Sequence, residues 1–170
     1  MSKEFSTWLI LLILNILFIC ILIIFNSTVT QLGILIYLPG LFFLSSSLFL
    51  RNFKGVMLCF ITGLFLDTAL NTPFGFHGIM LPIFQTVGCE WLKYNGNQNR
   101  YRQAFFQLFS NIFISVCLFL IYFMTELNYQ FNITKFLFDS LISAIVFLPI
   151  CYWYQDFLLY VLKFNSKVLN

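Results

Sequence analysis

The chain has 170 residues, of which 61% are hydrophobic and only 9% are charged, and its mean hydropathy is +0.92. A soluble domain carries about 25% charged residues, so this composition excludes a water-soluble fold and predicts an all-α integral membrane protein. The net charge of +3 is small and scattered, which excludes a nucleic-acid-binding protein.

Six apolar runs predict a compact bundle of six transmembrane helices, because a helix needs about 20 apolar residues to cross the hydrocarbon core. We expect one transmembrane domain over residues 1–170, with spans at about 8–25, 32–50, 55–70, 74–92, 104–124 and 135–154. Pro39, Gly40 and three serines interrupt the second run. Residues 155–170 either continue the sixth helix or form an amphipathic segment along the inner surface.

The basic residues predict the orientation of this bundle. With a cytoplasmic N-terminus, every basic residue except Lys135 falls in an inner segment, which favours six spans with both ends in the cytoplasm. We interpret the basic inner rim as setting the topology and contacting anionic lipid, with docking of a cytoplasmic partner as the alternative. The rim consists of Arg51, Lys54, Arg100 and Arg102.

The reactive side chains predict neither a metal site nor an enzyme. The cysteines all fall within predicted spans and form no C-x-x-C pair, which is typical of small buried apolar residues. His77 is the only histidine, so an H-E-x-x-H zinc site is excluded, and no nucleophile lies in a G-x-S-x-G context. We therefore expect a non-enzymatic protein without a cofactor.

Small residues recur on one face of the third predicted helix. Gly55, Cys59, Gly63 and Asp67 are spaced four apart, so they share a face that lets a neighbouring helix approach closely. An ionised carboxylate that faced lipid would cost about 2.5–3.5 kcal/mol at mid-bilayer. We therefore expect Asp67 to be buried in protein, near the outer end of the helix.

A turn joins Asp67 to His77. Thr72 is expected to cap the fourth helix, with Pro73 at its first position, and this places the two side chains at a similar depth. The positive N-terminal end of that helix favours a nearby anion. Two interpretations stay open: a polar pair that binds a partner or ligand, and a hydrogen-bonded pair that pins the helical hairpin.

The stretch GLFLDTALNTPFGFHG resembles the signature of the bacterial rod-shape-determining protein MreD family. The matching residues are Gly63, Asp67, Pro73, Gly75 and His77, and chain length and span number are also similar to the family. The resemblance implies a component of the cell-elongation (rod) complex in the bacterial inner membrane. Its implied partners are the single-span protein MreC, the actin-like filament protein MreB and the peptidoglycan synthase and transpeptidase pair.

Other polar residues leave a second function open. Asn111 and Ser115 lie on one face of the fifth helix, which is typical of contacts between membrane helices. Asp139 is a second acid on the outer side, and either pairs with Lys135 or faces a cavity with Asp67 and His77. The layout is also similar to the substrate-binding S-components of vitamin transporters, which would use such a cavity for a small ligand.

Overall fold

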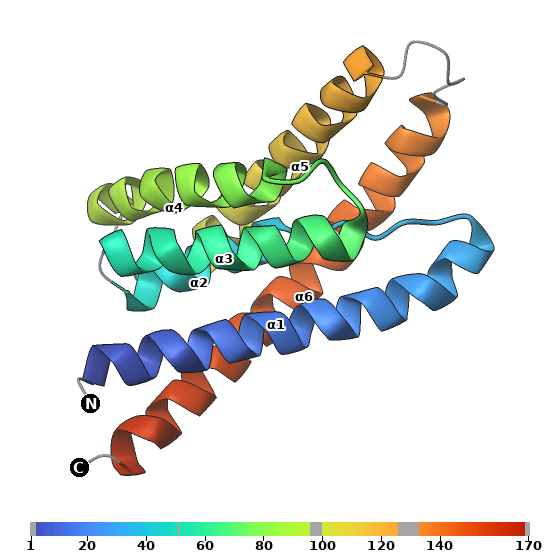
Figure 1. Cartoon of the computed structure of the whole chain (residues 1–170). Helices are drawn as coiled ribbons and strands as arrows, with labels where there is room; N and C mark the ends of the chain where they lie inside the picture. The colour runs from blue at the N-terminus through green and yellow to red at the C-terminus, as the bar shows by residue number, and fades with distance from the viewer. Residues whose placement is uncertain (1–2, 51, 96–99, 126–132, 169–170) are drawn as a thin grey trace.

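The structure is a computed structural model that describes residues 3–50, 52–95, 100–125 and 133–168. These residues form helices and no β-strand, and the two ends of the chain lie at the same end of the bundle in Figure 1. The elements are α1 (Lys3–Val29), the 3-10 turn η1 (Thr30–Leu32), α2 (Gly40–Phe49), α3 (Asn52–Leu70), α4 (Phe76–Asn95), α5 (Arg100–Thr125) and α6 (Ile133–Val168).

Four of these helices, α1, α3, α5 and α6, are long and apolar enough to cross a membrane. The prediction of a multi-pass, all-helical membrane protein is therefore confirmed. The expectation of six such helices is not met by the described residues. The helix α4 has 20 residues, but Gln85, Thr86 and Glu90 reduce its hydropathy, and α2 has only 10 residues.

The prediction of a spanning helix over residues 32–50 is wrong in its first half. Gly33 ends η1 in the left-handed region at φ +76°, and the chain then runs without helix as far as Pro39. Proline disfavours helical backbone in the residue before it, which explains why α2 begins only after Pro39. At 1.5 Å per residue, α2 is about 15 Å long, roughly half the thickness of the hydrocarbon core.

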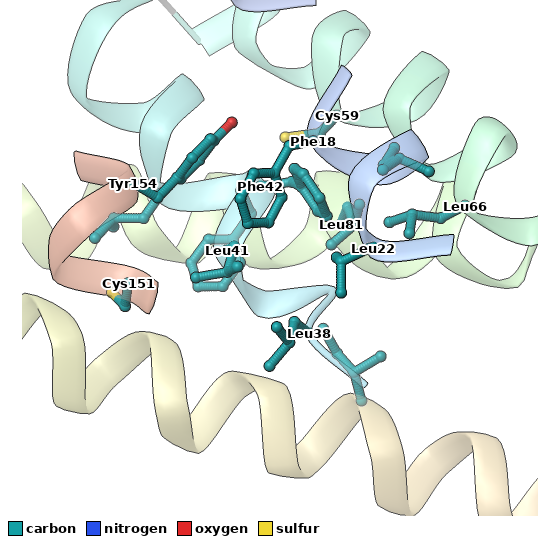
Figure 2. Packing of buried hydrophobic residues seen from close by; sticks show 14 of the residues in the cluster. Phe18, Leu22, Leu38, Leu41, Phe42, Cys59, Leu66, Leu81, Cys151 and Tyr154 are labelled. Atoms are coloured by element: carbon teal, nitrogen blue, oxygen red, sulfur yellow. The ribbon is translucent and has the colours of Figure 1, made fainter. Parts of the chain in front are cut away.

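The short helix α2 lies at the centre of the core. Its first seven residues, from Gly40 to Ser46, are all buried, so every face of this part of the helix contacts protein. Figure 2 shows Leu41 and Phe42 of α2 among side chains from α1, α3, α4 and α6, including Phe18 and Tyr154. A helix that is buried on all sides needs no polar face, which is consistent with its apolar sequence.

The helix α6 resolves the alternatives for the C-terminal segment within the described residues. It continues from Ile133 through Val168, 36 residues in all, and contains Pro149 without ending there. Residues 155–168 therefore continue the last helix and do not form a separate amphipathic element.

Candidate functional site

The Asp67 carboxylate, at the end of α3, accepts hydrogen bonds from both the turn and α4. Its Oδ1 accepts from the Thr72 hydroxyl at 2.9 Å, the His77 N–H at 3.0 Å and the His77 Nδ1 at 2.7 Å. Its Oδ2 accepts from the N–H groups of Gly75 at 2.9 Å and Gly78 at 3.4 Å. Since the first N–H groups of a helix have no partner within it, Asp67 caps α4 from the preceding helix.

This geometry corrects the expected cap of the fourth helix. The helix begins at Phe76 and not at Pro73, and Thr72 donates its hydroxyl hydrogen to Asp67. Gly75 adopts φ +90°, a left-handed conformation that side chains disfavour, and this directs its N–H at the carboxylate. The turn therefore wraps around Asp67 before α4 starts.

His77 connects this carboxylate to Tyr37 in residues 34–38, the extended segment before α2. Its Nε2 lies 2.5 Å from the Tyr37 hydroxyl, while its Nδ1 faces Asp67. An ionised carboxylate only accepts hydrogen bonds, so Nδ1 donates, and in the neutral imidazole Nε2 accepts from the phenol. Asp67 and His77 are 1% and 0% exposed, so neither offers a surface to a partner or ligand.

The extended segment is held in turn by side chains of α5 and α6. Asn111 donates to the Tyr37 carbonyl at 3.0 Å and accepts from the Gly40 N–H at 2.9 Å, while the Tyr37 N–H donates to Ser143 Oγ at 3.0 Å. On the α1 side, Asn26 makes the corresponding pair of bonds with the backbone of Ile36. These bonds satisfy non-helical backbone inside an apolar bundle, where no lipid group could do so.

The small residues of α3 face α4 and α2. A Cβ placed on Gly63 would lie 2.4 Å from the His77 carbonyl oxygen, and one on Gly55 would lie 2.4 Å from Gln85 Nε2. Cys59 Sγ lies 2.8 Å from the Ser46 hydroxyl of α2. The small-residue face of α3 therefore packs against α4 and α2 of the same chain.

Within the described residues, neither Asp139 nor Ser115 is hydrogen-bonded to Asp67 or His77. Asp139 Oδ1 accepts from the Leu35 N–H at 3.2 Å, at the start of the extended segment. Ser115 is buried on α5, one helical turn after Asn111. The structure therefore does not bring Asp67, His77 and Asp139 together around a common ligand.

The basic rim is divided among several elements. Arg100 NH1 lies 2.6 Å from Asp156 Oδ1 in an exposed ion pair, and Arg102 is exposed. Lys54 is partly buried, and its carbonyl accepts a hydrogen bond from the Trp8 indole at 3.2 Å. Arg51 lies outside the described residues.

Two further buried polar clusters join helices, through pairings that the sequence did not specify, although Asn15 was expected to bond between helices. Asn15 of α1 donates to Thr62 of α3 at 3.2 Å and accepts from the Tyr154 hydroxyl of α6. Gln107 of α5 accepts from Cys151 Sγ at 2.7 Å and Gln155 Nε2 at 2.9 Å. Isolated polar residues within apolar runs are the sequence signal for such contacts, but that signal does not reveal which residues pair.

Comparisons with known proteins identify no relative: no family model, no curated protein and no solved structure matches this chain. Within the part of the chain that the structure describes, no group of three or more His, Cys, Asp or Glu side chains could hold a metal ion. The role of Asp67 is therefore inferred from its geometry alone, and that geometry is a buried, hydrogen-bonded cluster.

Proposed function

We propose that the protein is a non-catalytic, multi-pass scaffold of the bacterial cell-elongation complex in the inner membrane. Its principal partner would be an MreC-like single-span protein, with an MreB-like filament and the wall synthase and transpeptidase as further partners. The bundle would cross the membrane six times with both ends in the cytoplasm, α2 and its extended segment making one of the crossings.

The observation that carries this proposal is the use of the motif residues within one structural unit. Gly63 permits the contact with α4, the Pro73 carbonyl accepts from the Phe76 N–H at 3.1 Å, and Gly75 and His77 both donate to Asp67. Because the motif residues form hydrogen bonds and close contacts with one another, they maintain the local fold and leave no reactive group exposed. This is the property that a non-catalytic scaffold requires.

The burial of the acid and the imidazole also argues against the alternative ligand-binding subunit. That function requires Asp67, His77 and Asp139 to face a common pocket. Asp67 and His77 are 1% and 0% exposed, and Asp139 binds the backbone of Leu35. No contact in the described residues favours the transporter role over the scaffold.

A crosslinking pull-down tests the proposal. The tagged chain would be crosslinked in its native membrane, purified in mild detergent and its partners identified by mass spectrometry. An unrelated multi-pass protein with the same tag and expression level serves as the control. Specific recovery of a single-span coiled-coil protein and wall synthases is expected; recovery of an ATPase pair with its membrane coupling subunit would overturn the scaffold proposal.

A further inference from the structure

A cavity of about 210 Å³ lies between α2, α5 and α6. Figure 1 places the start of α5 at the end of the bundle where the chain begins and ends, away from the α3–α4 turn that holds Asp67. The walls include Ser45 and Phe49 of α2, Arg100 and Gln103 of α5, and Gln155 and Leu158 of α6. The cavity is smaller than the ~300–1,000 Å³ typical of pockets for drug-sized ligands.

The cavity lining combines a cation, polar groups and apolar side chains. The Arg100 side chain is 55% exposed, whereas Gln103 and Gln155 are 3% and 9% exposed. The apolar part consists of Leu48, Phe49, Leu158 and Leu159. A ligand that matches this lining carries an anionic group, polar oxygens and an apolar part, as an anionic amphiphile does.

The charges near the mouth favour an anion. Arg100 has five N–H donors in a planar fork, and its bond to Asp156 occupies one of them. Such exposed ion pairs are weak and exchangeable, and a guanidinium binds phosphate through two parallel hydrogen bonds. The N-terminal end of α5, which begins at Arg100, adds the positive end of a helix dipole.

The face of α6 that borders the cavity continues to a further cation. Gln155 and Leu159 line the cavity, and Lys163 lies one helical turn beyond Leu159 on the same face. Arg102 lies two residues after Arg100 and is exposed.

We propose that this cavity binds the phosphate group of an anionic phospholipid from the adjacent leaflet, with Arg100 as the principal ligand of the phosphate. Gln103 and Gln155 would face the glycerol and ester oxygens, and the leucine and phenylalanine side chains of the lining would face the first part of an acyl chain. Because leucine and phenylalanine side chains give a free phosphate ion nothing to bind, the lining favours a lipid. The inference does not depend on the proposed scaffold function.

Lipid retention by the purified full-length chain tests this site. Native mass spectrometry would compare phosphatidylglycerol with phosphatidylcholine on the wild type, on Arg100→Gln and on Arg102→Gln. Both arginines are exposed and each substitution removes one positive charge, but only Arg100 lines the cavity. We expect Arg100→Gln to reduce phosphatidylglycerol retention about tenfold or more, as for a lost charge-assisted hydrogen bond, while Arg102→Gln retains it.

A second variant and a second ligand complete the test. Leu159→Trp fills the cavity without removing a charge, and we expect it to reduce retention while the melting temperature stays unchanged. Equal losses of phosphatidylglycerol retention in Arg100→Gln and Arg102→Gln would show that surface charge in general retains the lipid, and would overturn the proposed site. Binding of inorganic phosphate to the protein in phosphatidylcholine nanodiscs, abolished by Arg100→Gln, would overturn the lipid assignment in favour of a soluble phosphate.

Discussion

Asp67 shows how a carboxylate is accommodated inside an apolar bundle. Its two oxygens accept five hydrogen bonds, three from backbone N–H groups at the start of α4 and two from the side chains of Thr72 and His77. Hydrogen bonds to a charged group are about twice as strong as neutral ones, and the helix dipole adds to them. The burial of Asp67 is therefore compensated by hydrogen bonds from the turn and from the start of α4.

Asp67→Asn should destabilise the protein strongly, because an amide nitrogen would face N–H donors in place of one oxygen. Each buried donor left without an acceptor costs about 1–3 kcal/mol. We expect a large decrease in the free energy of unfolding, measured by titration with SDS in micelles. Thr68→Ala, next to Asp67 on the exposed face, is the control and should have little effect; equal stability of both variants would contradict this role of Asp67.

At the scale of elements, the pairing of α3 with α4 depends on glycines with different surroundings. A Cβ on Gly63 would lie 2.4 Å from a backbone oxygen of α4, whereas one on Gly78 would lie 3.0 Å from the flexible end of Leu64. Backbone cannot move aside without separating the helices, but a side-chain methyl group can rotate. We expect Gly63→Ala to reduce the melting temperature markedly, and Gly78→Ala to remain near the wild type in the same detergent.

The extended segment before α2 is the element that depends most on other helices. Asn111 satisfies both the Tyr37 carbonyl and the Gly40 N–H, so Asn111→Ala would leave two buried backbone groups unpaired. At about 1–3 kcal/mol for each group, the variant should unfold at a lower SDS fraction. Ser110→Ala provides the control, since its hydroxyl donates to Phe106 of its own helix; an unaffected Asn111→Ala would show that the segment is held elsewhere.

For the whole molecule, the direction of the helices makes a prediction about topology. Phe74 in the α3–α4 turn and Tyr94 near the end of α4 are 79% and 86% exposed, at opposite ends of α4. With both chain ends in the cytoplasm, a membrane-impermeant maleimide added to whole cells should label Phe74→Cys and not Tyr94→Cys. The wild type, whose cysteines lie within the helices, is the unlabelled control. Labelling of Tyr94→Cys alone would show that the protein has the opposite orientation in the membrane.

The two ends of α4 show which contacts local sequence patterns can predict and which they cannot. The Glu90–Lys93 pair near its C-terminal end, three residues apart, lies at 2.5 Å and raises the pKa of Lys93 through the hydrogen bond to Glu90. Spacing along one helix is enough to predict such a contact. The N-terminal end of α4 is different, because the residue that caps it is Asp67 of α3 and not the expected Thr72. Sequence patterns for helix caps consider only the residues next to the helix start, so they do not find Asp67.

The sequence by itself determined that the chain is a helical, multi-pass membrane protein, that α3 carries a small-residue face and that an acid and an imidazole flank one turn. Hydropathy and four-residue spacing are local properties, so they can be read without a structure. Only the tertiary structure decided that residues 34–38 lie outside any helix, that His77 reaches Tyr37, and that Asn15 joins Thr62 to Tyr154. Backbone in a membrane must find its hydrogen-bond partners within the protein, and here those partners come from helices distant in sequence.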